Sequence, residues 1–157
     1  MKGVRLYPNY HGYSLRDPRF LSLLKQAAGA GRVVQIAAAM EDVRTQHPLM
    51  QVAEVDLSPL PEILGGTEGA VVQILNSRPR GSLLQRLSET PGIFFDTSRV
   101  EGTDSVATLV RSLPQGRVLL GSHAPFRVPE AALIRTMEAQ LNANELRSVM
   151  CKGAGNL

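Results

Sequence analysis

The side chains best suited to chemistry in this sequence of 157 residues stand where short apolar runs end. His123 follows the run at 118–120, and Asp96 closes the run "GIFFD" at 92–96. An imidazole with a pKa near 6.5 suits proton transfer at neutral pH, and a carboxylate is another common general acid or base. The sequence therefore predicts His123 and Asp96 as catalytic residues. His123 could also be a metal ligand, or a turn residue whose ring hydrogen-bonds a nearby carbonyl.

A second group of polar residues lies in the first apolar run and at the ends of later ones. Arg5 precedes Tyr7 by two positions, so in a strand both side chains point to the same side. If that side is buried, the guanidinium needs an anion, either a protein carboxylate such as that of Asp96 or the carboxylate of a substrate. The predicted substrate-binding residues are Arg5, Tyr7, Asn9, His11, Glu41 and Asn76.

Two loops could cover these residues. The stretch "LYPNYHGYS" (6–14) holds all three tyrosines of the chain around His11, and it is either a lid over a ligand or a packed loop. Residues 40–56 form a connection far longer than the usual length of about two to six residues, and connections of that size are mostly functional. Two loops over one surface indicate a ligand pocket.

Five apolar runs must position these side chains. They are short and rich in β-branched residues, which is typical of strands that are covered on both faces. They are "GVRLY" (3–7), "VVQIAAA" (33–39), "AVVQIL" (70–75), "GIFFD" (92–96) and "RVLLG" (117–121). Each run is followed by a segment with helical spacing, and this alternation predicts an α/β fold of five βα units within a single domain, residues 1–157.

Helix start signals support the same alternation. They are found at Asp17–Pro18, at the predicted capping boxes Ser82/Gln85 and Asn142/Glu145, before the amphipathic segment 106–113 and at Pro129. The prolines at 59 and 61 allow only a short helix over 57–64. Three methionines are expected to fill gaps in the core, namely Met50, Met137 and Met150.

Composition excludes several classes of protein. Hydrophobic residues at 43% and charged residues at 20% are typical of a globular protein rather than a disordered one. The net charge of +3 is small and the basic residues are scattered, so no nucleic-acid partner is expected. The single cysteine, Cys151, forms no intrachain disulfide, and no run approaches the roughly 18 apolar residues of a membrane span. We therefore expect a cytoplasmic protein with no membrane partner.

Two architectures are compatible with five βα units. A doubly wound sheet accommodates five strands, whereas a TIM barrel needs eight strands and typically about 250 residues. The strand count by itself favours an open parallel sheet. No glycine-rich phosphate-binding motif follows any of the predicted strands.

Several longer stretches of the sequence resemble those of a known protein family. They are "KGVRLYPNYHGYSLRDPRF", "VVQIAAAMEDVRTQHPL", "GIFFDTSRVEG", "VLLGSHAPF" and the closing "KGAGNL". Together they resemble the C-terminal part of amidohydrolase-related proteins, the metal-dependent hydrolases built on a TIM barrel. The resemblance implies that residues 3–7 are the fourth barrel strand and residues 118–121 the eighth. The five units would then form an incomplete (β/α)8 barrel.

Five strands cannot close a barrel, and an open sheet leaves two edges with unpaired backbone groups. The expected explanation is that the sequence is a fragment of a longer protein. Alternatively, the chain pairs with a missing barrel half or forms a homo-oligomer.

The resemblance also implies a divalent metal such as zinc. The related hydrolases hold it with an HxH on the first strand, histidines after the fifth and sixth strands and an aspartate after the eighth. The matching positions in this sequence are Ala37, Asn76 and His123. Ala37 offers no lone pair and an amide is a poor ligand for transition metals, so these residues do not support the usual metal site. A displaced site would have to use His11, Glu41, Asp96 and His123.

Two functions remain open at this point. The resemblance implies an amidohydrolase-like enzyme that hydrolyses or decarboxylates a small organic substrate at the barrel mouth. The departures at the metal positions instead favour a non-catalytic descendant of the fold. Such a protein would bind a ligand or partner through residues 6–14, called the tyrosine loop below, and through the 40–56 loop.

Overall fold

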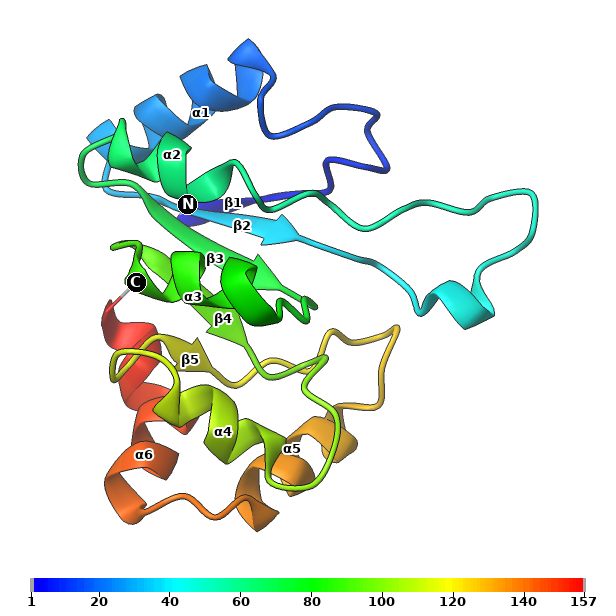
Figure 1. The fold of residues 1–157 in the computed structure, drawn as a ribbon, viewed down its shortest axis with the longest axis vertical. Coiled ribbons are helices and arrows are strands. Elements are labelled where there is room, and N and C mark those ends of the chain that lie inside the picture. The colour runs from blue at the N-terminus through cyan, green and yellow to red at the C-terminus, as the bar shows by residue number, and fades with distance from the viewer. Residues whose placement is uncertain (1, 157) are drawn as a thin grey trace.

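The computed structural model describes residues 2–156, without the side chains of Val43 and Asn156, and contains one five-stranded parallel sheet (Figure 1). Its strands are β1 (Gly3–Leu6), β2 (Val33–Ala37), β3 (Val71–Leu75), β4 (Ile93–Asp96) and β5 (Val118–Leu119), in the spatial order β1-β2-β3-β4-β5. The chain therefore advances across the sheet in one direction. A doubly wound sheet reverses its strand order, so this winding is that of a barrel, and the five predicted βα units are confirmed.

Helices follow the strands in the expected alternation. They are α1 (Pro18–Gly29), α2 (Leu60–Gly65), α3 (Gly81–Glu89), α4 (Ser105–Arg111), α5 (Pro129–Glu138) and α6 (Ala143–Arg147), with a π-helical turn η2 (Ser148–Lys152) and the 3-10 turns η1 (Val43–Thr45) and η3 (Gly153–Asn156). Figure 1 shows the carboxyl ends of the strands on one side of the molecule and both chain ends on the opposite side. Over residues 2–156, no helix combines the length and apolar character that crossing a membrane requires.

Alternation along the strands gives the sheet two different faces. One face packs apolar side chains against the helices: Val34, Ile36, Val72, Ile74, Ile93 and Phe95 share a core with Leu24, Leu60 and Leu87. The opposite face carries a row of residues that are in register across four strands, Arg5, Gln35, Gln73 and Phe94. In a closed barrel this second face would be the interior.

Two of the predicted helix caps are confirmed and one is wrong. The carboxylate of Asp17 accepts a hydrogen bond from the backbone N–H of Arg19 at 2.8 Å, and Asn142 with Glu145 forms the expected capping box. The helix expected to be capped by Ser82 instead begins at Gly81 with Arg80 as its N-cap. Gly81 adopts a φ of 56°, so the helix begins two residues earlier than expected and Ser82 lies inside its first turn.

Strand β5 is shorter than the apolar run that predicts it. It ends at Leu119, because the backbone N–H of Leu120 donates to the carbonyl of Val149 in η2 at 2.9 Å rather than to a neighbouring strand. The residues from 120 onward therefore leave the sheet early and cross toward the loops at the carboxyl ends of β2–β4.

The expected core positions of two methionines are wrong. Met50 is 71% exposed in the 40–56 loop, and Met137 is 64% exposed on α5. Helix α5 buries its small residues Ala132 and Thr136 and leaves its larger apolar side chains in solvent, so its amphipathic pattern misleads.

Candidate functional site

The carboxyl ends of β3, β4 and β5 lie on one side of the molecule (Figure 1). Asp96 closes β4, and Asn76 and His123 follow β3 and β5 in the sequence. In a TIM barrel this side holds the chemistry, because the loops after the strands converge there. Asn76 is hydrogen-bonded to Asp96, and His123 is hydrogen-bonded to the loop after β2. The predicted catalytic residues thus lie in one region, although each has a different environment.

Asp96 is buried at the end of β4 and organises the neighbouring turns. Its Oδ1 accepts hydrogen bonds from the backbone N–H of Asn76 at 3.0 Å, from the Ser98 hydroxyl at 2.8 Å and from the Ser98 N–H at 3.4 Å. Burial raises the pKa of the carboxyl above its usual range, and the hydrogen bonds from Ser98 and Asn76 oppose that rise. The Asp96 carboxyl therefore ties the ends of β3 and β4 together.

Gly121 makes this burial of Asp96 possible. A Cβ at position 121 would lie 2.7 Å from both the Cβ and the Oδ2 of Asp96, which is closer than nonbonded atoms approach. The absence of a side chain at Gly121 lets the chain after β5 pass directly over the carboxyl group.

Asn76 takes the position that follows the third strand, and its side chain is fully buried. Its Nδ2 donates to the carbonyl of Ala39 at 2.8 Å, which joins the end of β3 to the start of the 40–56 loop. Its Oδ1 has no hydrogen-bond partner among the described residues, and its φ is 50°. Asparagine tolerates a left-handed backbone better than most residues, so the unfavourable feature of Asn76 is its buried carbonyl oxygen without a hydrogen-bond partner among the described residues.

His123 lies after β5 with a φ of 55° and is half-buried. Its Nε2 is 2.8 Å from the carbonyl oxygen of Met40, which belongs to the loop after β2. A carbonyl only accepts hydrogen bonds, so Nε2 carries the hydrogen and the neutral ring keeps its lone pair on Nδ1. The carbonyl partner therefore comes from a distant loop, not from the turn around His123 itself.

The pKa of His123 is lowered from its usual value, mainly because burial disfavours the charged ring. The hydrogen bond to Met40 and the charge of Asp96 favour the imidazolium and oppose this shift, while the positive charges of Arg127 and Arg5 add to it. At neutral pH the ring is consequently neutral. In this tautomer a proton would be accepted at Nδ1.

Of the two kinds of anion considered for a buried Arg5, the carboxylate of Asp96 is not its partner in the structure, and the guanidinium is not buried. Arg5 is exposed, and its Nε donates to Oε1 of Gln35 at 2.9 Å, while Nε2 of Gln35 donates to Oε1 of Gln73 at 2.7 Å. These three residues form a ladder of hydrogen bonds across β1, β2 and β3. No ion pair or hydrogen bond joins Arg5 to Asp96 among the described residues, and Oδ1 of Asp96 accepts from Asn76 and Ser98 instead.

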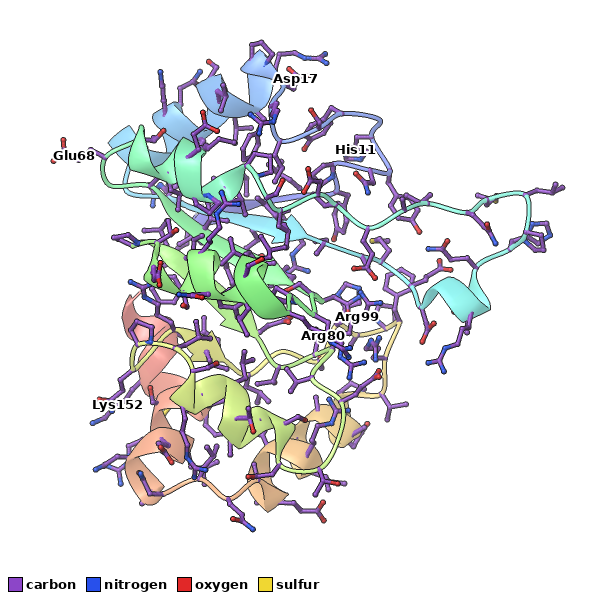
Figure 2. All side chains as sticks on the ribbon, viewed as in Figure 1. His11, Asp17, Glu68, Arg80, Arg99 and Lys152 are labelled. Carbon is purple, nitrogen blue, oxygen red and sulfur yellow. The ribbon has the colours of Figure 1, made fainter. Side chains whose placement is uncertain are left out.

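The tyrosine loop lies beside the 40–56 loop. His11, labelled in Figure 2, is exposed and its ring centroid lies 6.2 Å from that of Tyr7 and 6.4 Å from that of Tyr13. The side-chain amide of Asn9 donates to the carbonyl of Ala53. Asn9 and Tyr13 line a cavity of about 550 Å³ between the two loops, whereas His123 and Asp96 do not line it.

The base of the 40–56 loop is joined to the turn after β4. Oε1 of Glu54 lies 2.6 Å from Nη1 of Arg99, a residue that Figure 2 labels at the carboxyl side of the sheet. Nη1 of Arg99 makes no hydrogen bond among the described residues, so the contact is an ion pair. Glu41, at the start of the same loop, lies close enough to Tyr10 that its charge adds to the rise that burial causes in the pKa of Tyr10.

A displaced metal site is not assembled by the described side chains. Across residues 2–156, no group of three or more histidine, cysteine, aspartate or glutamate residues is arranged to hold a metal ion. Ala37 is buried and has no donor atom, and Asn76 has only an amide oxygen to offer. The residues present therefore do not fit the metal centre that the family resemblance implies.

Some residues of the site were not predicted from the sequence. Ser98 closes the turn around Asp96, and the pattern Asp-Thr-Ser after a strand is a turn signal that could have indicated it. The ladder glutamines had a clearer signal, because "VVQI" occurs at both 33–36 and 71–74, and the two copies pair in register. The role of the Met40 carbonyl could not be predicted from the sequence, because every residue has a main-chain carbonyl.

The fold and site define a part of a TIM barrel with a polar cluster at the carboxyl ends of its strands. No protein-family model and no curated protein matches the chain. Solved structures with the same fold include an uncharacterized TIM-barrel protein from Bordetella bronchiseptica, with a TM-score of 0.75 and 13% sequence identity. That match covers 100% of this chain and 57% of the Bordetella protein.

Two kinds of enzyme are among the other similar structures. One is a candidate amidohydrolase from Staphylococcus aureus, with a TM-score of 0.66, 10% identity and coverage of 99% of this chain and 64% of that protein. The other is 2,6-dihydroxybenzoate decarboxylase from Rhizobium, with a TM-score of 0.72, 8% identity and coverage of 99% and 62%. This chain thus spans about three fifths of each barrel that it resembles. At such low identity the likeness shows the fold alone.

Proposed function

We propose that this protein acts on a small organic molecule at the carboxyl ends of its strands, with His123 as the group that moves the proton. The observation that carries the proposal is the hydrogen bond between Nε2 of His123 and the carbonyl of Met40, which leaves the lone pair on Nδ1. Similar folds in an amidohydrolase candidate and a decarboxylase agree with a small organic substrate.

Hydrolysis is the reaction that suits a neutral His123. Nδ1 takes a proton from water while the water oxygen forms a bond to the carbonyl carbon of an amide or ester. The carbon–nitrogen or carbon–oxygen bond to the leaving group then breaks, and the imidazolium returns the proton to the departing atom. Decarboxylation would need the ring in its acid form to protonate carbon, and the lowered pKa of His123 disfavours that form at neutral pH.

Asp96 is a positioning residue in this proposal. Its Oδ1 is occupied by Asn76 and Ser98, and its Oδ2 lies against Gly121, so it acts through the geometry of the turns and through the charge it presents to His123. No step uses a metal ion, because the described residues do not assemble a set of ligands.

A second candidate function is binding without turnover. It is favoured by the cavity of about 550 Å³ between the tyrosine loop and residues 51–56, which neither His123 nor Asp96 lines. A ligand held there by Asn9 and Tyr13 would not meet the proton-transfer group.

The test is a screen of the purified protein against small amides, esters, lactones and 2,6-dihydroxybenzoate, with product detection by mass spectrometry. His123→Asn is the variant of choice, because asparagine tolerates the left-handed backbone at this position. We expect wild-type turnover to rise with pH through a midpoint below 6.5 and then level off, and His123→Asn to lose it by about a hundredfold or more.

Circular dichroism and thermal melting of His123→Asn establish that the variant is folded. Turnover that persists in a folded His123→Asn protein would refute the role of His123. Tight binding of a panel member without any product would favour the binding function instead.

A further inference from the structure

The chain after β5 leaves the sheet, yet it stays attached to the end of β4. The last main-chain hydrogen bond between the two strands runs from the N–H of Thr97 to the carbonyl of Leu119 at 3.0 Å. The next residue, Leu120, donates its N–H to the carbonyl of Val149 instead. From Gly121 onward, the chain is therefore held near β4 by other contacts.

The hydroxyl of Thr97 provides these contacts. Its Oγ1 accepts a hydrogen bond from the N–H of Gly121 at 3.2 Å and donates to the carbonyl oxygen of Gly121 at 3.4 Å. A hydroxyl has one hydrogen to donate and lone pairs to accept with, so one side chain binds both main-chain groups of Gly121. Thr97 is fully buried, so water does not compete for its hydroxyl.

Gly121 connects this contact to the candidate site. It packs so closely against the carboxyl group of Asp96 that a Cβ at position 121 would lie 2.7 Å from Oδ2. His123 follows two residues later, and its Nε2 reaches the carbonyl oxygen of Met40 at 2.8 Å. A link of two residues leaves little slack, so a shift of Gly121 would be passed on to the imidazole ring.

The turn after β4 joins three strand ends in this way. Asp96 accepts from the N–H of Asn76 after β3, and Thr97 binds Gly121 after β5. Ser98 donates its hydroxyl to Asp96 and so holds the turn itself together. Three consecutive residues therefore align the carboxyl ends of β3, β4 and β5.

We propose that Thr97 is the positioning residue of His123: its hydroxyl fixes Gly121, and Gly121 sets the place from which the imidazole reaches Met40. This inference deepens the proposed function and rests on it for any effect on turnover. Thr97 touches no reacting atom in that scheme and acts only through the ring that it positions.

A purely structural role is the alternative, because a buried hydroxyl that is hydrogen-bonded stabilises any part of a fold. Thr136 offers a matched comparison. It is as fully buried as Thr97, and its hydroxyl donates to the carbonyl of Ala132 at 2.9 Å within α5. Thr97→Val and Thr136→Val thus remove the same hydroxyl from equally buried positions, and only the first should change the behaviour of His123.

The experiment is an NMR titration of the His123 imidazole in the purified protein, with the ring 15N shifts reporting the tautomer. The wild type should show the Nε2–H tautomer and a pKa below 6.5. In Thr97→Val the ring is released toward solvent, so its pKa should rise toward the ordinary 6.5 and both neutral tautomers should appear. Thr97→Ser keeps the hydroxyl and should behave as the wild type does, as should Thr136→Val.

A second measurement uses the wild type alone and decides the question even if Thr97→Val does not fold. Hydrogen exchange at the N–H of Gly121 should be slowed by about a hundredfold or more relative to an unstructured glycine amide, because a buried hydroxyl accepts it. Exchange at the unprotected rate would overturn the proposal. So would a folded Thr97→Val protein whose His123 keeps the wild-type pKa and tautomer, or an equal change of both in Thr136→Val.

Turnover separates this inference from the proposed function. With a substrate found by the screen, Thr97→Val should lower turnover by about tenfold or more and Thr97→Ser should retain it, because a displaced base loses alignment with its substrate. An inactive wild type in which Thr97→Val still changes the pKa and tautomer of His123 would reject the catalytic role and support the positioning role. Turnover that is lost in His123→Asn but unchanged in folded Thr97→Val would reject the positioning role alone.

Discussion

The Nε2 atom of His123 lies 2.8 Å from the main-chain carbonyl oxygen of Met40, although 83 residues separate the two in the sequence. This hydrogen bond fixes the tautomer of the ring and couples the loop after β5 to the loop after β2. The tautomer selected by this hydrogen bond has its lone pair on Nδ1, which is the atom that would accept a proton.

The first prediction concerns the titration of His123. Because burial lowers its pKa below the usual 6.5, the folded protein binds fewer protons at this ring than the unfolded chain does. The ring therefore contributes stability that is complete above pH 6.5 and is lost as the pH falls through the folded-state pKa. NMR of the imidazole protons should give a midpoint below 6.5, and urea unfolding should show this loss in the wild type but not in His123→Asn. A midpoint above 6.5 would contradict the structure.

The second prediction concerns Asp96 and has the opposite sign. Its pKa is raised from the usual 3.8, so the folded state holds the proton more tightly than the unfolded chain does. The stability that this group contributes is present below pH 3.8 and is lost as the pH rises through the raised folded-state value. The free energy of unfolding of the wild type, measured from pH 4 to pH 7, should include a decrease that comes from the ionisation of Asp96. Asp96→Asn, which cannot ionise, should lack it, and identical pH profiles for the two proteins would refute the assignment.

The third prediction concerns Gly121. A methyl group at this position would meet Asp96 at 2.7 Å, so Gly121→Ala should lower the free energy of unfolding by about 1–3 kcal/mol through overpacking. Gly29→Ala is the matched control, because nothing lies within 4 Å of a Cβ at the end of α1. Chemical denaturation should leave that variant within about 0.5 kcal/mol of the wild type. Equal effects of the two substitutions would show that Asp96 does not restrict position 121.

The fourth prediction separates backbone strain from hydrogen bonding at Asn76. Both Asn76→Gly and Asn76→Ala remove the hydrogen bond to Ala39, but only glycine adopts a φ of 50° without a steric penalty. Asn76→Ala should therefore be less stable than Asn76→Gly by about 1 kcal/mol in urea unfolding. If the alanine variant is the more stable one, the left-handed conformation is not present at this position.

The fifth prediction concerns the anchoring of the 40–56 loop. Glu54→Gln removes the ion pair with Arg99 and should speed tryptic cleavage after the exposed Arg44 in the same loop. Glu68→Gln is the control, because Figure 2 shows Glu68 at the opposite end of the molecule. Cleavage at Arg44 that is equally fast in the wild type and in both variants would mean that the ion pair does not hold the loop.

Much of the architecture could be read from local patterns. The five apolar runs, the cap at Asp17 and the capping box at Asn142 depend on a few neighbouring residues, and the structure has all of them. The boundaries of β5 and of α3 were not predictable in the same way. One depends on a hydrogen bond to the distant Val149, and the other on the backbone conformation of Gly81.

The residues at the strand ends can be identified from the sequence, because strand periodicity and turn residues are local properties of the chain. His123, Asp96 and Asn76 were found in that way. Their partners follow from the folded arrangement: Asp96 accepts hydrogen bonds from Asn76 and Ser98, and Arg5 joins a ladder of glutamines. The physical reason is that hydrogen bonds and desolvation depend on distances between elements far apart in the chain, and these distances exist only once the sheet has assembled.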